Sequence, residues 1–331
     1  MARLKEYNGH YCESEYEYAF IGFLEAEGWK YSSGNNISRV TKRDVLIADD
    51  FKKFIADTNP DLIDDEVTQI YDNVRLVGAE SDFATLHKVY GWMVNGVQFT
   101  PQDGLPRMIP LIDFDNWDKN IFRVVNQFTV EYTNNGQKEN RRPDVLLFVN
   151  GMPLCVIELK NPADANATIY DAWEQINIRY WRDIPHLLHY CPLACISDGV
   201  KTRLGTVRTP YEHFYAWRRV NEGDAVSTLP FAETETMIKG VYAPERFLEI
   251  FRDYIYFQDS IYDSDEVEIV CRYPQFFAAR LLKQSIIKSV VEKSGKGGTY
   301  FGATGCGKTY TMAFLARQLA LRCTHVPEIG S

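Results

Sequence analysis

The sequence predicts an α/β or α+β fold. Helical and strand-like patterns alternate along most of the chain, which is typical of these classes. Asn150-Gly151 separates two apolar, β-rich runs and therefore predicts a hairpin. A glycine-rich segment near the C-terminus leads into a second helical pattern. With 331 residues, 45% of them hydrophobic and 14% aromatic, the chain can form a sizeable core.

The N-terminal third is predicted to be mainly helical. Tyr16, Phe20 and Leu24 recur at helical spacing within residues 12–28, and Gly28 stands where a C-terminal cap belongs. Residues 50–90 carry similar apolar stripes on an acidic background. No apolar run approaches the ~20 residues that span a bilayer, so we expect no membrane partner.

The middle of the chain is predicted to form the sheet and one long helix. The helix covers residues 168–181, where Ile169, Trp173, Ile176 and Tyr180 share one face. The strands are expected at residues 122–132, 144–149, 153–159, 193–197, 202–207 and 213–218.

The C-terminal third is predicted to hold a connector and a second unit. Residues 220–265 are acidic and poorly patterned, which favours a helical connector, and residues 276–291 are predicted to form a helix. A short strand is expected at Tyr300-Phe301. We therefore expect a first domain over 1–220, an acidic connector over 221–268 and the start of another domain over 269–331.

Charge and cysteine content narrow the functional class. The net charge of −9 argues against a protein that binds nucleic acid over its whole surface, but a local basic groove is compatible with it. The seven cysteines are scattered and odd in number, so we expect reduced thiols in a cytoplasmic protein. Basic residues gather in the middle of the chain: Arg141, Arg142, Arg179, Arg182, Lys201, Arg203, Arg208, Arg218 and Arg219.

Asp144, Glu158 and Lys160 form the pattern that points most directly to chemistry. Mg²⁺ prefers hard oxygen ligands, usually one or two carboxylates with water and substrate phosphate. Bound beside a phosphodiester, such an ion promotes hydrolysis, and a lysine can orient the water or stabilise charge. Glu158 also lies within the apolar run Leu154–Leu159, where an unpaired carboxylate is costly. These residues predict an Mg²⁺ site that cuts nucleic acid.

The hairpin register decides whether this site can exist. A plain two-residue loop at Asn150-Gly151 would pair Asp144 with Ile157 and turn Glu158 to the other face. A three-residue loop or a β-bulge would pair Asp144 with Glu158, and Lys160 would then share their face. We therefore predict a three-residue loop or a bulge.

Residues 302–309 fit the phosphate-binding pattern G-x-x-x-x-G-K-[ST]. Its glycines let backbone N–H groups surround phosphate oxygens at a helix N-terminus. Lys308 would reach the terminal phosphates of ATP, and Thr309 would ligate the accompanying Mg²⁺. The expected nucleotide-binding residues of this loop are Gly302, Thr304, Gly305, Cys306, Gly307, Lys308 and Thr309.

Two other catalytic or metal classes receive little support. The spacing of His186, His189, Cys191 and Cys195 lacks a C-x-x-C pair, so core packing is favoured over zinc. No G-x-S-x-G elbow of a serine hydrolase is present.

The chain resembles the nuclease domain of type I restriction endonuclease R (motor) subunits, which carry the PD-(D/E)xK signature. The resemblance covers about residues 10–331 and rests on several stretches: Asn126–Val130, Arg142-Pro143-Asp144, Leu154–Lys160, Ala172–Ile176, Ile184-Pro185 and Ile196–Gly199. It implies an α/β fold with a restriction-endonuclease-like mixed sheet flanked by helices, then a helical connector and the start of a RecA-like helicase lobe.

The resemblance also assigns roles to residues. Asp144 and Glu158 would be metal ligands, Lys160 the catalytic lysine, and Glu17 a further acidic residue, for which Glu13 and Glu15 compete. The family has a Gln-x-x-x-Tyr element, but here Arg179 occupies the tyrosine position after Gln175, and Tyr180 follows one residue later. Gln175, Arg179 and Tyr180 are therefore candidate DNA contacts, with a buried aromatic role as the alternative for Tyr180.

Gln275, within Arg272–Gln275, resembles the glutamine that reads adenine in superfamily 2 helicases; the alternative is a glutamine at a helix start that faces water. The resemblance implies Mg²⁺-dependent cleavage of double-stranded DNA, coupled in a full complex to ATP-driven translocation. It also implies methyltransferase and specificity subunits as partners.

Only 23 residues follow Lys308, so we expect an N-terminal fragment that is weak or inactive alone and does not hydrolyse ATP. A repair-type helicase–nuclease and a non-catalytic assembly module are the alternatives.

Overall fold

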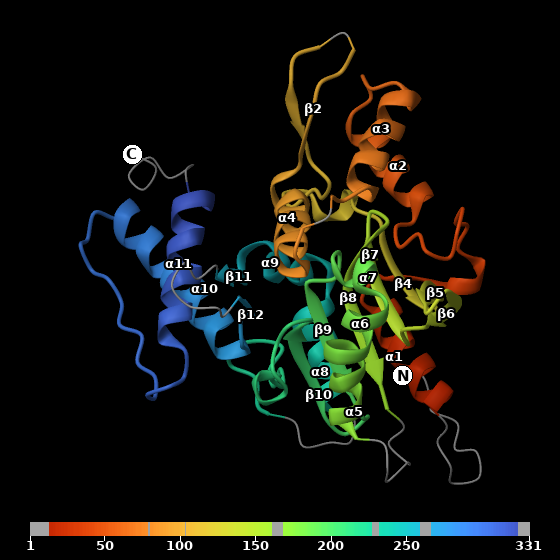
Figure 1. The fold of residues 1–331 in the computed structure, drawn as a ribbon. Helices are drawn as coiled ribbons and strands as arrows, with labels where there is room; N and C mark the ends of the chain where they lie inside the picture. The colour runs from red at the N-terminus through yellow and green to blue at the C-terminus, as the bar shows by residue number, and fades with distance from the viewer. Residues whose placement is uncertain are drawn as a thin grey trace.

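The centre of the molecule is a six-stranded mixed sheet in the order β1-β4-β7-β8-β9-β10 (Figure 1). The computed structural model describes residues 13–78, 80–102, 104–160, 168–226, 232–258 and 266–323. The β1/β4 and β8/β9 pairs are parallel and the other neighbours antiparallel. The strands are β1 (Lys30–Ser33), β4 (Phe122–Asn126), β7 (Val145–Val149), β8 (Met152–Leu159), β9 (Leu193–Ser197) and β10 (Thr202–Thr206). The predicted α/β class with a helix-flanked mixed sheet is confirmed.

Helices cover both faces of this sheet because its central strands are apolar on both sides. All residues of β7, β8 and β9 are buried. On one face lie α5 (Ile169–Glu174), the π-helix η3 (Gln175–Tyr180) and α6 (Trp181–Asp183), which are drawn in front of the sheet in Figure 1. On the other lie α1 (Glu13–Ala26), α8 (Ala232–Met237), the π-helix η5 (Ile238–Tyr242) and α9 (Pro244–Asp253).

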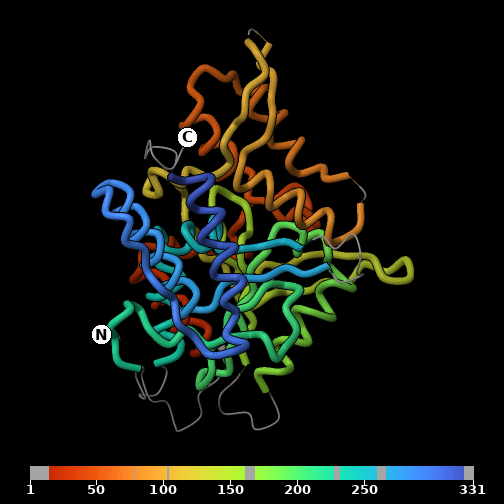
Figure 2. The backbone as a smooth tube through the Cα atoms, turned by 90° about the vertical axis from the view of Figure 1, so that its left-hand side faces the viewer, coloured from red at the N-terminus to blue at the C-terminus, as the bar shows by residue number. Residues whose placement is uncertain are grey.

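An upright helical part stands beyond one end of the sheet (Figures 1 and 2). It contains α2 (Ala48–Thr58), α3 (Asp64–Arg75), α4 (Asp82–Asn95) and the hairpin β2 (Val97–Phe99) and β3 (Arg107–Ile109). Short helices lie between the larger elements: η1 (Gly34–Asn36), η2 (Trp117–Lys119), α7 (Pro185–Leu188) and η4 (Tyr211–His213). A second hairpin, β5 (Val130–Asn134) with β6 (Gln137–Arg141), projects sideways in Figure 2.

The C-terminal unit consists of the ribbon β11 (Ile255–Gln258) and β12 (Val267–Val270), the helix α10 (Tyr273–Val291) and the helix α11 (Lys308–Arg322). It shares one continuous core with the sheet. The ring of Tyr254 lies 5.0 Å from that of Phe276 and 5.5 Å from that of Phe314, between centroids. The second unit is therefore packed onto the first and not merely tethered to it.

Residues that the sequence favoured as a connector contribute strongly to this core. Phe247 and Phe251 of α9 are fully buried. The indole N–H of Trp29 donates to the Tyr242 carbonyl at 2.6 Å. Within these helices Glu235 and Glu245 are exposed, whereas the apolar residues of η5 and α9 are buried in the common core.

Several predicted strands differ from the structure. The run 122–132 is broken at Gln127, whose φ of +55° ends β4 before β5 begins. The strand predicted over 213–218 is reduced to a single bridge between Tyr215 and Leu204. Tyr300-Phe301 forms no strand, and Phe301 is 93% exposed, because no described strand lies beside it.

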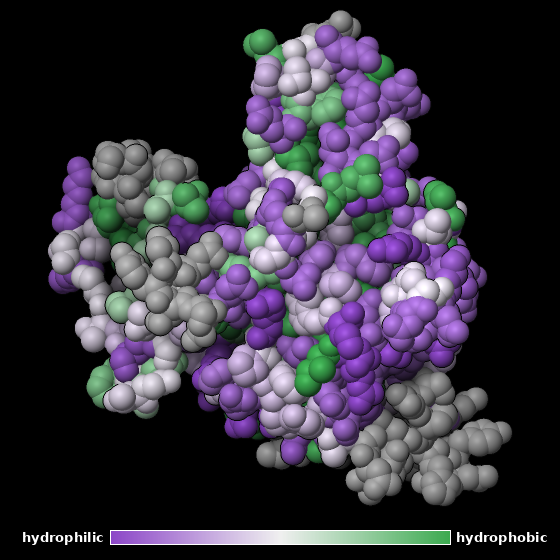
Figure 3. All heavy atoms as spheres, in the orientation of Figure 1, coloured by the Kyte–Doolittle hydropathy of each residue, from purple (hydrophilic) through white to green (hydrophobic). Residues whose placement is uncertain are grey.

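The surface in the view of Figure 3 is mostly hydrophilic, with apolar side chains in small separate groups. Within the described ranges, no helix combines the length and the apolar character needed to cross a bilayer.

Candidate active site

The loop between β7 and β8 is a two-residue turn at Asn150-Gly151. Both residues have positive φ, +50° and +76°, as a type I′ hairpin requires. The fully buried Asn150 side chain accepts from the Ile121 N–H at 2.8 Å and donates to the Leu111 carbonyl at 3.0 Å. The prediction of a three-residue loop is therefore wrong, because this buried asparagine stabilises the shorter turn.

The alternative prediction, a β-bulge, is confirmed. Leu147 lies opposite Cys155 while Phe148 lies opposite Pro153, so Leu154 is the extra residue on β8. Beyond the bulge Val145 pairs with Ile157, which places Asp144 opposite Glu158. The backbone N–H of Leu159 donates to Asp144 Oδ2 at 2.8 Å. The two carboxyl groups therefore share one face of the sheet.

Glu158 is fully buried yet belongs to a hydrogen-bonded ring of side chains. Tyr180 donates its hydroxyl to Glu158 Oε1 at 2.5 Å, and Gln175 Nε2 donates to that hydroxyl at 2.8 Å. Lys160 Nζ donates to Gln175 Oε1 at 3.0 Å and lies 3.9 Å from Glu158 Oε2. Glu158 Oε2 itself has no hydrogen-bond partner among the described residues. The ring fixes the orientation of the Glu158 carboxyl group and leaves its Oε2 atom without a hydrogen bond from the described residues.

The π-helix η3 explains how Tyr180 joins this ring. In a π-helix, residues i and i+5 are hydrogen-bonded neighbours, as i and i+4 are in an α-helix. Gln175 and Tyr180 span one such turn, so both side chains face Glu158. The extra residue that separates this segment from Gln-x-x-x-Tyr is therefore accommodated by local widening of the helix.

Burial and like charge perturb the acidic pair. Burial raises the pKa of Glu158 well above its ordinary value, and the neighbouring Asp144 carboxylate raises it further. Lys160 and the Tyr180 hydroxyl oppose this rise. Burial also raises the pKa of Asp144, against the hydrogen bond from the Leu159 N–H. The pair therefore resists double ionisation unless a cation joins it.

The three candidate DNA contacts lie in different environments. Tyr180 is fully buried, so the interpretation as a direct DNA contact does not fit; its other interpretation, a buried aromatic, does. The Gln175 side-chain amide accepts a hydrogen bond from Lys160 and donates one to Tyr180. Arg179 pairs with Glu174 at 3.0 Å, and half of its side-chain surface is exposed. Of these three, Arg179 is the one that faces outward.

Glu17 is on α1, and its side chain lies against the end of β4, the strand next to β7. It accepts hydrogen bonds from Asn126 Nδ2 at 2.6 Å and from Gln127 Nε2 at 3.0 Å. No group of three or more His, Cys, Asp or Glu within the described ranges is arranged to hold a metal ion. Glu17 therefore does not complete a three-carboxylate group with Asp144 and Glu158.

The donor set nevertheless suits a hard divalent cation. Glu158 Oε2 is buried and unpartnered, and Asp144 lies opposite it on the adjacent strand. A cation would satisfy the orphaned oxygen and stabilise the ionised form of both carboxyls. The two carboxyl groups therefore fit Mg²⁺, which prefers oxygen ligands of this kind.

Of the four residues weighed for zinc, Cys191 and Cys195 lie in the core, whereas His186 and His189 are half-buried. Cys191 and Cys195 are fully buried, and burial raises the pKa of each thiol. Burial lowers the pKa of His186 to about 4. His189 pairs with Asp82 at 2.8 Å. The finding on metal groups covers these residues too, so the preference for core packing agrees with the geometry.

The glycine-rich loop has the backbone expected of a phosphate site. Gly305 and Gly307 adopt φ of +79° and +81°, and α11 begins at Lys308 directly after them. Lys308 Nζ donates to the carbonyls of Gly302 and Ala303, each at 2.9 Å. Thr304 and Thr309 are exposed, while Cys306 is half-buried. The N–H groups of the first helical turn lie at the open end of this loop.

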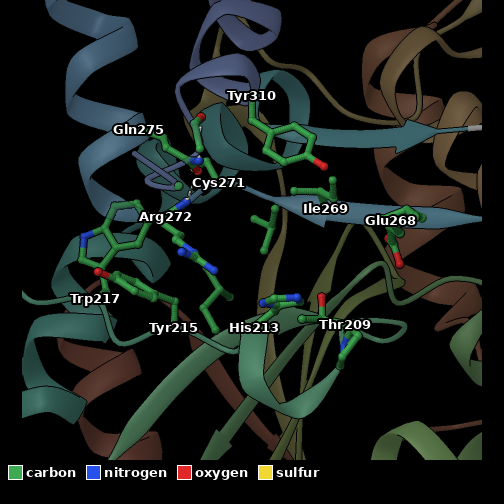
Figure 4. A pocket seen from close by; sticks show the side chains of 16 residues that line it. Thr209, His213, Tyr215, Trp217, Glu268, Ile269, Cys271, Arg272, Gln275 and Tyr310 are labelled. Carbon is green, nitrogen blue, oxygen red and sulfur yellow. Dashed lines mark hydrogen bonds between the residues drawn. The ribbon is translucent and has the colours of Figure 1, made fainter. Parts of the chain in front are cut away.

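Gln275 lies against the same loop and does not face water. Its Nε2 donates to the Gly307 carbonyl at 3.2 Å, and its Oε1 accepts from the Arg272 N–H at 2.8 Å. Gly307 has φ of +81°, which favours glycine, and a Cβ there would displace the Gln275 amide, which is drawn in Figure 4. The glutamine is 4% exposed and ties α10 to the loop.

Residues 11–213 match the family model described as type I restriction enzyme R protein N terminus. A Methanocaldococcus jannaschii protein assigned to the endonuclease subunits of type I restriction enzymes is 29% identical over 91% of this chain and 31% of its own length. The type I restriction enzyme HindI endonuclease subunit of Haemophilus influenzae is 28% identical over 93% of this chain and 30% of its own length.

A third relative is the type I restriction enzyme SauCOLORF180P endonuclease subunit of Staphylococcus aureus. It is 26% identical over 64% of this chain and 20% of its own length. The chain thus spans less than a third of the length of these curated relatives.

Proposed function

Because the chain belongs to the type I restriction enzyme R protein N-terminal family, we propose that the group around Asp144 and Glu158 is an endonuclease site for double-stranded DNA. The observation that carries this proposal is the buried Glu158 carboxyl, whose Oε2 accepts no hydrogen bond from the described residues and lies beside a second carboxyl and 3.9 Å from Lys160 Nζ. A buried acidic pair of this kind is costly for a purely structural region and useful for catalysis.

Asp144 and Glu158 would hold Mg²⁺. When bound, the ion supplies charge stabilisation at the scissile phosphate and lowers the pKa of a water molecule. Lys160 is held by Gln175 so that its ammonium group stays within 3.9 Å of Glu158, where it can orient a water or balance charge on the phosphate. Tyr180 keeps Glu158 in one orientation, and Arg179 is positioned to contact a DNA backbone phosphate.

For the C-terminal unit we propose an ATP site at residues 302–309 and the beginning of a RecA-like helicase lobe. The support is the pair of left-handed glycines before α11 and the contact of Gln275 with the loop. Thr309 would ligate the Mg²⁺ that accompanies ATP. Similarity to endonuclease subunits of type I restriction enzymes supports coupling of cleavage to ATP-driven translocation, in a complex with methyltransferase and specificity subunits.

The decisive experiment compares Glu158→Ala with Glu25→Ala, a change of an exposed glutamate on α1. Two readouts are measured: Mn²⁺ binding by electron paramagnetic resonance, and cleavage of supercoiled plasmid by the chain in its restriction complex. We expect Glu158→Ala to lose both, whereas Glu25→Ala keeps both.

Cleavage and Mn²⁺ binding that survive Glu158→Ala would refute the endonuclease site and favour an assembly role. A melting temperature close to wild type shows that the loss is chemical and does not reflect unfolding.

A further inference from the structure

The hairpin β5–β6 is attached to the molecule directly beside the proposed active site. Residues 127–129 join it to the end of β4, and Arg142 and Pro143 join it to Asp144. The Gln127 N–H donates to the Asp144 carbonyl at 3.3 Å. Each strand has five residues, so the hairpin extends about 17 Å at ~3.4 Å per residue. A long, narrow element therefore projects from the body next to the acidic pair (Figure 2).

One face of the hairpin is fastened to the body. Val130 lies opposite Arg141 and Tyr132 opposite Glu139, so these four side chains share a face. Val130 and Tyr132 are buried, and Arg141 pairs with the buried Asp183 of α6 at 2.6 Å. Tyr132 donates its hydroxyl to Glu139 at 2.6 Å. An isolated two-stranded hairpin is marginally stable in water, so these contacts hold this one in a fixed direction.

The opposite face of the hairpin has no such attachment. Thr133 lies opposite Lys138, and Asn140 follows the same alternation along β6. All three side chains are exposed, as are Asn135 and Gln137 at the tip. None of these five side chains forms a hydrogen bond or an ion pair with another described residue. The hairpin thus presents a row of unpaired polar groups on a rigid support.

The charge of this face differs from that of the whole chain. The chain has a net charge of −9, yet within residues 130–141 the acidic groups lie away from the exposed tip. Glu139 is on the fastened face, and Glu131 is half-buried at the base. Lys138 is exposed near the tip, and Arg142, which follows β6, is exposed and forms no ion pair with a described residue. An amide-rich face with unpaired cations suits a polyanion.

The dimensions of the hairpin match one groove of double-stranded DNA. The major groove is about 12 Å wide and admits a two-stranded β-ribbon, whereas the minor groove is about 6 Å wide. The groove is about 8.5 Å deep, which is less than the length of the hairpin. Asparagine and glutamine each offer a donor and an acceptor to base edges, and lysine and arginine contact phosphates.

We propose that the hairpin β5–β6 lies in the major groove of double-stranded DNA beside the phosphate that is cut. Asn135 and Gln137 contact base edges, and Lys138 and Arg142 contact the phosphates that border the groove. This rests on the proposed endonuclease function and adds the surface that holds its substrate. Because the hairpin is rooted next to Asp144, its position in the groove sets which phosphate reaches the acidic pair.

The first test compares a hairpin variant with a matched control in the restriction complex. Asn135→Ala, Gln137→Ala and Lys138→Ala are combined, since these exposed side chains support no contact in the described structure. We expect plasmid cleavage to fall about tenfold, as the loss of a few polar DNA contacts implies. Mn²⁺ binding and co-purification with the other subunits should stay as in wild type.

Lys30→Ala is the matched control and should cut plasmid as wild type does. Lys30 is an exposed strand lysine without an ion pair to a described residue. It lies opposite Arg123 on β4, whereas Asn126 at the other end of that strand is next to the hairpin. The two lysines therefore lie toward opposite ends of the sheet.

The second test identifies the groove. In DNA that contains 5-iodouracil in place of thymine, the photoreactive atom takes the place of the thymine methyl group, which lies in the major groove. Gln137→Tyr supplies an aromatic acceptor at the tip, and Lys30→Tyr supplies one at the far end of the sheet. After irradiation of the complex with Ca²⁺ in place of Mg²⁺, mass spectrometry should find the crosslink on the hairpin peptide of Gln137→Tyr and none at Lys30→Tyr.

Three results would overturn the proposal, and they differ in what else they reject. If the combined variant cuts as Lys30→Ala does, or if Gln137→Tyr cuts DNA without a crosslink on the hairpin, the groove contact is wrong while the endonuclease site stands. If the combined variant no longer co-purifies with the other subunits, the hairpin docks a protein and not DNA. If the wild-type complex does not cut DNA, the endonuclease function and the groove contact both fail.

Discussion

At the level of single residues, the chain places a carboxyl group in the fully buried strand β8 and surrounds it with three side chains that act on it. Glu158 is fully buried, yet Tyr180, Lys160 and Asp144 all act on it. Such an arrangement stabilises one geometry of the carboxyl at the cost of folding stability. Two consequences can be measured separately, one in the reaction and one in the unfolding equilibrium.

Tyr180→Phe tests the role of Tyr180 as a positioning residue. A hydrogen bond to a charged group contributes about 1.5–3 kcal/mol, so we expect DNA cleavage to fall roughly 10- to 100-fold. The Tyr180 hydroxyl lowers the pKa of Glu158, and its loss must raise that pKa. The acid limb of the pH–rate profile should therefore move to higher pH. A fall in rate with an unshifted profile would indicate general damage to packing.

Glu158→Gln should stabilise the protein at neutral and alkaline pH in the presence of EDTA. Because the folded-state pKa of Glu158 is raised, the folded state binds more protons than the unfolded state above pH 4.5, and stability declines as pH rises through that window. The amide removes this decline. We expect a gain of about 1–3 kcal/mol at pH 8 that disappears near pH 4, measured by urea unfolding. An equal gain at both pH values would contradict this cause.

At the level of elements, two backbone irregularities assemble the site. The bulge at Leu154 turns Glu158 to the face of Asp144, and the π-helix η3 turns Tyr180 to the same place. Neither device adds a side chain to the site. Each instead shifts the register of an element by one residue, which rotates the existing side chains toward one another.

Deletion of the exposed Ile178, which keeps Arg179 in the chain, should be tolerated. Without this residue, η3 can become an ordinary α-helix in which Gln175 and Tyr180 are four positions apart and still adjacent. We expect a cleavage rate within about threefold of wild type, because the activation free energy should change by less than about 1 kcal/mol. Insertion of an alanine after Asn177 is the control and should abolish the contact between Tyr180 and Glu158. If the deletion is as damaging as the insertion, the widened turn has another role.

Gly151→Ala should destabilise the hairpin more than the same change at another left-handed glycine. Gly136 at the tip of β5–β6 has φ of +79° and open space around it, so alanine there should cost about 1–2 kcal/mol. Gly151 has φ of +76°, and a Cβ would also collide with the Ile47 carbonyl at the start of α2. We expect an additional loss of at least about 1 kcal/mol in urea unfolding. Equal losses would show that the backbone of α2 moves away freely.

The sequence allowed the sheet and the acidic pair to be predicted, but only part of the surrounding structure. Strands β7, β8 and β9 were predicted because continuous apolar runs are long enough to define them. The bulge was one of two alternatives predicted from the register that places Asp144 and Glu158 on one face. The π-helix was not predicted, since one extra residue leaves the helical pattern almost unchanged. The ribbon β11–β12 was missed because Glu268 interrupts its apolar pattern. The strand at Tyr300-Phe301 was expected from composition, but no strand among the described residues pairs with it.

At the level of the whole molecule, α11 is attached to α9 through a buried acidic residue. Asp253 is 2% exposed and accepts from Arg322 Nε at 3.2 Å and from Arg252 at 3.1 Å. Arg317 of the same helix donates to the Ile255 carbonyl at 2.8 Å. These contacts attach the second half of α11, the helix that follows the proposed phosphate loop, to the core that also supports the sheet.

Asp253→Asn should loosen this attachment. The loss of a buried charge-assisted hydrogen bond predicts about 2 kcal/mol less stability, concentrated in α11, where amide hydrogen exchange should accelerate. Asp57→Asn removes an exposed pair with Lys53 and should change stability by less than about 0.5 kcal/mol. Uniform acceleration of exchange over the whole sheet would mean that the two units unfold together.

The half-buried Cys306 gives this chain a native chemical reporter. The other described cysteines, Cys155, Cys191, Cys195, Cys271 and Cys323, are buried, so a maleimide reagent has little access to them in the folded protein. Cys306 lies between the two left-handed glycines, where bound phosphates would cover it. With Cys12, which lies outside the described residues, replaced by serine, the alkylation rate of Cys306 would follow occupancy of the loop without any attached fluorophore.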